Sequence, residues 1–359
     1  MAADKRRKRK PVRQYFSTPK KGCRTYGANK KWRCNASRPK CSSTEGDLII
    51  STPLQERALA EALCSQCNYV EKPKVNCLSL FDGLSAGLFV LLNRLGLDVG
   101  NYFSSEIDED ATKVQTFHFF EEITKVGDVR NLSTYHLKKF GAVNLLLAGS
   151  PCNDVSRVNP LRKLLYDPDG TGILFFEFIR IRNYLNAAAM EGGYEFFWLF
   201  ENVTNLDADT LQDMNSFLGC TPIKMIPASS TRERYFWGNV PGMKEKHMDI
   251  RVNFVPLQSF LDPGRTAGID LLGTITTSSS STKRKGTGCD AVVFQNGEPS
   301  ELHLTEIEKS LGFPSHFTDV NLPYTRRLKL LGKTWDIDIV QDILEPLCTL
   351  FRKKAVLET

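Results

Sequence analysis

From residue 74 onward, apolar segments of strand length alternate with segments that have helical periodicity. The strand-like segments are CLSLFD (77–82), NYFSSEI (101–107), VNLLLAG (143–149) and FFWLFEN (196–202). Between them lie amphipathic stretches such as AGLFVLLNRLG (86–96) and DATKVQTFHFF (110–120). Apolar strands that alternate with helices are typical of a mostly parallel sheet covered by helices on both faces. The pattern therefore predicts an α/β fold, with its functional groups at the carboxyl ends of the strands.

The pattern changes after residue 254. Residues 255–300 are rich in Gly, Ser and Thr, contain SSSSTKRKGTG (278–288), and have little helical periodicity. Helical patterning returns at 303–312 and at 336–353. We interpret 255–300 as a small recognition insert within the α/β domain.

Residues 1–73 differ from the rest in composition and charge. Residues 1–40 contain fifteen Lys and Arg against one acid, whereas the remaining 319 residues have a balance of −8. Six consecutive cations, KRRKRK at 5–10, suit a nuclear-import signal or a phosphate-binding arm, although a solvated tail has the same composition. We therefore divide the chain into a basic, largely disordered or small N-terminal region (1–73) and a domain that begins at residue 74. The predicted location is the nucleus.

The ten cysteines are expected to be reduced thiols rather than a disulfide framework, because no apolar export signal follows Met1. Cys64 and Cys67 form one Cys-x-x-Cys pair. A structural zinc site normally has a second pair or two histidines, so zinc remains an open alternative there, and no metal is predicted elsewhere. No apolar run approaches the roughly 18 residues of a membrane span.

Three successive strand ends carry groups that suit a nucleoside. The first strand ends in FDGLSAGL (81–88), where a glycine turn brings backbone N–H groups close to a polar ligand. The second ends in Glu106, which is placed to accept hydrogen bonds from a ribose diol. The third ends near Asp128, which is placed to accept from an adenine amino group. Each acid alone is also a candidate helix N-cap, but three in register favour a nucleoside cofactor such as S-adenosylmethionine.

The next two strand ends carry a thiol and a carboxylate. The fourth strand delivers GSPC (149–152) and the fifth delivers ENV (201–203), both on the cofactor side of the sheet. A lone cysteine after proline is ordinarily structural. Paired with Glu201, however, Cys152 suits covalent catalysis on cytosine, in which thiolate addition at C6 and proton donation to N3 make C5 able to accept a methyl group.

Two arginines in TRERYFWGN (231–239) complete this group. Arg232 and Arg234 are candidates to hold the base carbonyl and the flanking phosphate. Nearby arginines or helix dipoles are also expected to favour the thiolate of Cys152.

Residues 75–351 resemble the catalytic domain of the DNA cytosine-C5 methyltransferases, most closely the de novo branch. The resemblance implies a Rossmann-like, S-adenosylmethionine-dependent methyltransferase fold with a small target-recognition insert, acting on double-stranded DNA. The stretches that carry it occur in family order and are LSLFDGLSAGL, SEIDED, GDVRNLS, GSPCNDVSRVNP, GTGILFFEFIRI, FWLFENV, RERYFWGN, GTITTSSS, LGFPSHFTDV and LLGKTW.

The resemblance also implies roles for single residues. Cys152 is the expected nucleophile and Glu201 the general acid, and Arg232 and Arg234 support the base. The expected cofactor pocket consists of Phe81, Asp82, Gly83, Ala86, Glu106, Ile107, Asp128, Val129, Pro151, Lys333 and Trp335. The expected DNA contacts, on a loop that helps to replace a flipped base and on the insert, are Ser156, Val158, Pro160, Thr276, Ser278, Lys283, Arg284 and Lys285.

The sequence departs from the family pattern in three places. Ser278 stands where the de novo enzymes carry a basic residue that reads the guanine of CpG, a contact worth about 1–3 kcal/mol of discrimination. The resemblance implies CpG-type de novo methylation. Because of Ser278, we expect the preference for the guanine of CpG to be weaker or changed. Lys333 stands where an arginine is common, and the family's N-terminal reader modules are not recognisable in 1–73.

Three questions stay open at this point. The family joins catalytic domains through an aromatic surface, so we expect a homo- or hetero-oligomer through Phe175, Phe176 and Phe178, with core packing as the alternative interpretation. A tRNA cytosine-C5 methyltransferase shares the Pro-Cys and Glu-Asn-Val pieces. A catalytically silent paralogue that recruits an active enzyme is the third alternative, against which the presence of Cys152 and Glu201 argues.

Overall fold

The computed structural model describes residues 72–243, 250–251, 254–275 and 291–355, all of which belong to one compact unit, Tyr69–Thr359. The basic segment 5–10 and the Cys64–Cys67 pair lie outside the described residues. The same holds for five of the predicted DNA contacts, Thr276, Ser278, Lys283, Arg284 and Lys285.

Eight strands of the described part form one sheet in the order β3-β2-β1-β4-β5-β7-β6-β8. Neighbouring strands are parallel except that β7 runs antiparallel to both β5 and β6. The predicted strands at 77–82, 101–107, 143–149 and 196–202 correspond to β1, β2, β4 and β5, which confirms the mostly parallel α/β fold. The strands are β1 (Val75–Leu80), β2 (Val99–Ser105), β3 (Ile123–Lys125), β4 (Leu145–Gly149), β5 (Phe197–Val203), β6 (Ile223–Ile226), β7 (Arg234–Gly238) and β8 (Ile250–Arg251).

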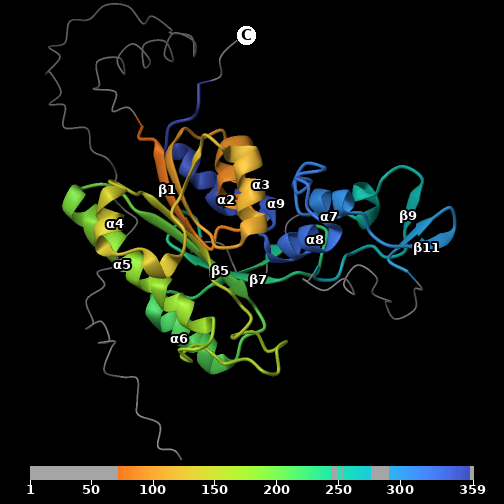
Figure 1. Cartoon of the computed structure of the whole chain (residues 1–359), viewed down its shortest axis with the longest axis horizontal. Helices are drawn as coiled ribbons and strands as arrows, with labels where there is room; N and C mark the ends of the chain where they lie inside the picture. The colour runs from red at the N-terminus through yellow and green to blue at the C-terminus, as the bar shows by residue number, and fades with distance from the viewer. Residues whose placement is uncertain (1–71, 244–249, 252–253, 276–290, 356–359) are drawn as a thin grey trace, which may run out of the picture. The chain divides into compact units, whose positions relative to one another are not determined.

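Alternation along the central strands gives each face of the sheet its own core. In β4, Leu145 and Leu147 belong to one hydrophobic cluster, while Leu146 and Ala148 belong to the other, because successive side chains of a strand point to opposite faces. Helices cover both faces, as Figure 1 shows. They are α2 (Ala86–Phe89), α3 (Glu109–Phe119) and α9 (Ile337–Leu344) on the first face, and α4 (Thr134–Lys139), α5 (Phe175–Gly192) and α6 (Ala208–Leu218) on the second.

Local sequence explains how these helices begin and pack. Asp108 caps α3, since its carboxylate accepts hydrogen bonds from the N–H groups of Asp110 and Ala111. Gly87 lets α2 lie close to the sheet, because a Cβ at this position would lie 2.4 Å from a methyl carbon of Leu147. The turn after β1 is thereby held against β4.

Beyond the main sheet, the described part of 254–333 forms a smaller layer. A three-stranded antiparallel sheet consists of β9 (Arg265–Ala267), β10 (Val293–Gln295) and β11 (Glu298–Ser300). The helices α7 (Leu304–Ser310) and α8 (Tyr324–Lys333) lie between this sheet and the main one (Figure 1). None of the helices in the described ranges is both long and apolar enough to cross a membrane.

The phenylalanines of α5 do not form a surface. Phe175 and Phe178 are fully buried, and Phe176 is 6% exposed. Their rings contact Phe200 of β5 and Phe217 of α6, because α5 turns its apolar face toward the sheet. The predicted oligomer contact through these three residues is therefore wrong, and the core-packing interpretation is correct.

Candidate active site

The carboxyl ends of the parallel strands gather the candidate residues at one edge of the main sheet. The strands β1, β2, β4 and β5 are parallel neighbours, so the segments that follow them emerge at that edge. The antiparallel strand β7 begins where β5 ends, with Arg234 opposite Val203. This reversal places Arg234 beside Glu201, although Arg234 comes 33 positions later in the chain.

Glu201 receives one donor on each carboxylate oxygen. The Nε of Arg234 lies 3.0 Å from Oε1, and the indole Nε1 of Trp335 lies 3.1 Å from Oε2. The side chains of Glu201 and Arg234 are 12% and 14% exposed. Because N–H donors on both oxygens restrict rotation, this carboxyl is fixed in orientation at the end of β5.

Cys152 follows β4 on the neighbouring loop and is partly buried. Burial raises the pKa of its thiol, and the negative charge of Glu201 raises it further, while Arg234 and Arg232 lower it by less. The structure thus brings both arginines within electrostatic reach of the thiol, as the sequence predicted. Their effect is outweighed, however, so the expectation of a favoured thiolate is wrong for the ligand-free protein.

Arg232 is buried beside the same group. Burial and the charge of Arg234 lower its pKa to about 9. Its Nη2 donates to the carbonyl oxygen of Gly332 at 3.2 Å, whereas its Nε has no hydrogen-bond partner among the residues that the structure describes. An unpaired buried donor costs about 1–3 kcal/mol, which favours an acceptor supplied by a ligand.

Two residues that the sequence analysis did not single out hold the Cys152 loop. The buried Asn202 donates through Nδ2 to the carbonyl oxygen of Ser150 at 3.3 Å and to its hydroxyl at 3.2 Å. Asp154 accepts from the N–H and the hydroxyl of Thr171 at 2.6 and 2.9 Å. The polar pair directly after the cysteine was the available signal for Asp154, since Asp and Asn side chains often bond to nearby backbone.

The loop beyond Cys152 exposes apolar side chains. Val158 is 78% exposed and Leu161 85% exposed, and Pro160 is also exposed. Ser156, in contrast, is buried, and its hydroxyl accepts from the N–H of Val158 at 3.3 Å. Of the three predicted DNA contacts on this loop, the structure therefore places Val158 and Pro160 at the surface and Ser156 inside it.

Glu106 lies at the adjoining edge with spare acceptor capacity. Its Oε2 accepts from the N–H of Gly83 at 2.7 Å, and its Oε1 accepts from the N–H groups of Ile107 and Asp108 at 2.8 Å each. Burial raises the pKa of this carboxyl, against the effect of the three backbone donors. A carboxylate has about four acceptor positions, so one remains for a ligand hydroxyl.

The other predicted cofactor residues have varied surroundings. Asp82 accepts from the hydroxyls of Tyr102 at 2.7 Å and Ser85 at 2.6 Å, so it shapes the glycine turn. Asp128 is held by Arg130, whose Nε lies 3.0 Å from each carboxylate oxygen, and this pairing lowers the pKa of Asp128. A nucleobase amino group must therefore compete with Arg130. Ala86 and Val129 are buried, Phe81 and Pro151 are partly exposed, Ile107 is exposed, and Lys333 donates to Asp108.

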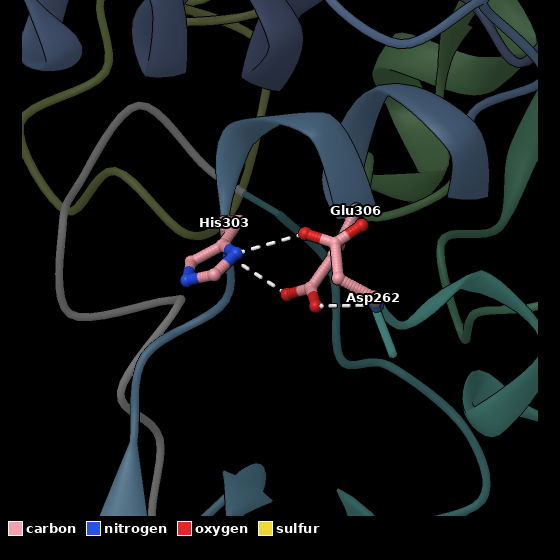
Figure 2. Close-up of side chains that lie close together, drawn as sticks. All are labelled: Asp262, His303 and Glu306. Carbon is pink, nitrogen blue, oxygen red and sulfur yellow. Dashed lines mark hydrogen bonds and ion pairs between the residues drawn. The ribbon is translucent and has the colours of Figure 1, made fainter. Parts of the chain in front are cut away.

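A second cluster of polar side chains lies in the smaller layer, where Asp262, His303 and Glu306 converge (Figure 2). His303 Nδ1 lies 2.9 Å from Asp262 Oδ2. Two cations already balance the two acids, since Arg265 Nε lies 2.7 Å from Glu306 Oε1 and Lys309 Nζ lies 2.9 Å from Asp262 Oδ1. The adjacent hollow, of about 970 Å³, is lined by Asp262 and His303 but not by Cys152 or Glu201. We interpret the cluster as an ion-pair network that fixes α7.

The sheet order defines the Rossmann-like fold that methyltransferases share. The solved structure of the methyltransferase EhMeth from Entamoeba histolytica is similar with a TM-score of 0.58 and 16% identity, and the match covers 77% of this chain and 98% of that one. A DNMT2 mutant from Spodoptera frugiperda is similar with a TM-score of 0.52 and 15% identity, over 76% of this chain and 99% of that one. At these identities the likeness concerns the fold.

Sequence comparison supports the same family. Residues 75–218 match the model of the C-5 cytosine-specific DNA methylases, which confirms the predicted resemblance to this family. The DNA (cytosine-5)-methyltransferase DRM2 of Oryza sativa subsp. japonica is 30% identical over 127 residues, and DRM2 of Arabidopsis thaliana is 28% identical over 123. Each match covers 32% of this chain and 20% or 19% of the relative, so the chain matches about a fifth of these proteins' length.

The family and the fold imply S-adenosylmethionine as the cofactor. The residues at the edge fit this molecule, since Glu106 retains an acceptor position beside the Gly83 turn. The family model ends at residue 218, before Arg234 and Trp335. These two donors to Glu201 therefore lie outside the matched region.

Proposed function

We propose that the protein transfers the methyl group of S-adenosylmethionine to C5 of cytosine in double-stranded DNA. One observation carries the proposal: Glu201 lies fixed by two N–H donors within electrostatic reach of the Cys152 thiol. A thiol and a carboxyl that face one ring are the two groups that C5 methylation requires.

In this proposal the thiol of Cys152 loses its proton to water and Sγ bonds to C6 of the base, while Glu201 gives a proton to N3. The ring then has an electron-rich C5. S-adenosylmethionine supplies the methyl group when it is bound. After C5 has taken the methyl group, the C5 proton leaves to water and Cys152 leaves C6, which restores the ring. Because the thiol is held protonated in the ligand-free protein, we assign Arg232 and Arg234 the task of stabilising negative charge once the base separates the thiol from Glu201.

Arg232 also supports the proposal for base recognition. Its buried Nε lacks a partner in the described part of the chain, and an exocyclic carbonyl oxygen is a suitable acceptor. Glu106 would accept from the ribose of the cofactor. Lys333, which bonds to Asp108 next to Glu106, would lie at the same end of the site.

Base flipping is required because C5 and C6 are inaccessible inside a stacked duplex. The exposed Val158 and Pro160 follow Cys152 on its loop, and we assign them to the space that the flipped base leaves. The basic N-terminal region supports contact with DNA and a nuclear location. CpG-type de novo methylation remains our proposal for the target, with the preference altered at Ser278.

The test incubates labelled S-adenosylmethionine with duplex DNA, duplex RNA or tRNA, using the parent protein, Cys152→Ala and Glu201→Gln. We expect label on DNA with the parent protein only. DNA that contains 5-fluorocytosine should in addition leave a covalent complex with the parent that survives denaturation. Label on tRNA alone would replace the DNA assignment by the tRNA alternative, and no label on any substrate would leave the silent paralogue.

A further inference from the structure

The contact between Trp335 and Glu201 joins two distant parts of the chain. Trp335 lies between α8 and α9, 134 residues after Glu201, and its indole N–H donates to Oε2 at 3.1 Å. The ring is fixed edge-on against Phe236 of β7, with a centroid separation of 6.5 Å. A partly buried tryptophan whose N–H meets a carboxylate is thus built into the candidate active site.

Gly149 leaves the space that this contact occupies. A Cβ at Gly149 would lie 2.9 Å from Nε1 of Trp335 and 3.0 Å from Oε2 of Glu201. Gly149 stands directly opposite Glu201 in the pairing of β4 with β5. The strand end that delivers Cys152 therefore also sets the position of the Trp335–Glu201 hydrogen bond.

The segment that carries Trp335 also reaches Glu106. Lys333 Nζ donates to Asp108 Oδ2 at 3.1 Å, and the N–H of Asp108 donates to Glu106 Oε1 at 2.8 Å. Lys333 and Trp335, two positions apart in the chain, therefore link Glu106 to Glu201: Lys333 through Asp108 and Trp335 by its own hydrogen bond.

The two oxygens of Glu201 are not equivalent. Oε1 faces the guanidinium of Arg234 in an ion pair, whereas Oε2 faces a neutral indole that only donates. A proton on the carboxyl is therefore best tolerated at Oε2. When the Oε2–H bond breaks and the N3–H bond of the base forms, the indole N–H gains an ionised acceptor, and hydrogen bonds to ionised acceptors are the stronger ones.

We propose that Trp335 is a positioning residue that holds Oε2 of Glu201 as the proton-donating atom and favours departure of its proton. The segment of Trp335 also makes the orientation of this carboxyl depend on the Glu106 side of the site. The inference rests on the proposed role of Glu201.

The test uses Trp335→Phe, which keeps the ring and removes the N–H donor. Trp237→Phe is the matched control, because the indole of Trp237 also donates to a side chain, Asn215 Oδ1 at 2.7 Å, but on α6. The first measurement is the rate of Cys152 alkylation by iodoacetamide in protein without cofactor or DNA, with Cys152→Ala as the blank.

Trp335→Phe should change the alkylation rate by about 3-fold, because the Glu201 carboxylate that raises the pKa of the Cys152 thiol is no longer held in place by the indole. Trp237→Phe should leave the rate unchanged. In a Glu201→Gln background, the effect of Trp335→Phe should vanish, since the change acts through the charge of Glu201.

The second measurement is methyl transfer. Trp335→Phe should lower kcat by about tenfold, the size of one hydrogen bond to a charged group. If either the alkylation rate or kcat of Trp335→Phe matches the parent, or if the alkylation effect persists in Glu201→Gln, the inference is wrong. Should Trp335→Phe not unfold cooperatively, Gly149→Ala disturbs the same bond and replaces it.

The two proposals fail in different ways. A parent protein that methylates nothing overturns the proposed function, yet the alkylation comparison still tests the coupling between Trp335 and Glu201. An active parent whose alkylation ignores Trp335 overturns only the inference.

Discussion

Gly149→Ala adds a single methyl group at the point where β4, Glu201 and Trp335 meet. Its Cβ would lie 2.9 Å from Trp335 Nε1 and 3.0 Å from Glu201 Oε2. Comfortable non-bonded contacts lie at about 3.5–4.0 Å, so each neighbour must retreat by about 0.5–1 Å. The backbone itself tolerates alanine, because Gly149 does not have a positive φ angle.

The expected magnitude follows from this displacement. Overpacking of this kind destabilises a protein by about 1–3 kcal/mol. A shift of about 1 Å in a catalytic group can lower a rate by about 100-fold. We therefore expect the rate of methyl transfer at saturating substrate to fall by about 10- to 100-fold. The free energy of unfolding, measured in urea, should fall by only about 1–3 kcal/mol, so the protein stays folded in the assay.

Gly100→Ala is the matched control. Its Cβ would lie 2.6 Å from Oδ1 of Asn76, which is comparable crowding at the amino end of β1 and β2. This variant should lose stability and retain the parent's rate. The reasoning would be refuted if Gly149→Ala kept the parent's rate, or if both variants lost activity equally.

Three further predictions concern other parts of the molecule. Val158→Ala should slow methylation of a fully paired duplex more than that of a mismatched cytosine, because an unpaired base costs less to flip; equal slowing of both in initial-rate assays would contradict this. Arg265→Leu should lower the free energy of unfolding by about 3–5 kcal/mol in urea, since it leaves the buried Glu306 charge unpaired, whereas Arg265→Leu combined with Glu306→Leu should recover much of the loss. Burial raises the pKa of Asp336 to about 7 in the folded protein, above the usual value near 3.9, so its contribution to stability is lost as pH rises from about 4 to about 7. Asp336→Asn, which keeps an N-cap side chain for α9, should therefore raise the melting temperature at neutral pH and not below pH 4, and an equal change at both values would argue against a buried charge.

The raised pKa of the Cys152 thiol affects how reactive this side chain is before a base binds. Burial and the carboxylate of Glu201 both raise the pKa of the thiol. A protonated thiol resists oxidation and alkylation, because the thiolate is the reactive form. On our proposal the nucleophile is therefore activated only when a base occupies the space between the two side chains.

Periodicity determined the fold class and placed the candidate residues at one edge of the sheet. Apolar strands that alternate with helical segments specify a parallel sheet, because each strand must bury both faces. In such a sheet the strand ends share one edge, so Glu106, Cys152 and Glu201 could be assigned to one site from their positions in the sequence alone. Asp154 could also have been found, since its partners lie close along the chain.

Tertiary structure decided the partner of each group and its burial. Phe175 and Phe178 look equally suited to an interface or a core from the sequence, and only the packing of α5 on the sheet distinguishes the two. The indole that holds Glu201 comes from 134 residues away, and no local pattern encodes such a pairing. The charge state of Cys152 is likewise set by burial and by the balance between one carboxylate and two arginines, because electrostatic energies depend on distance and on the local dielectric.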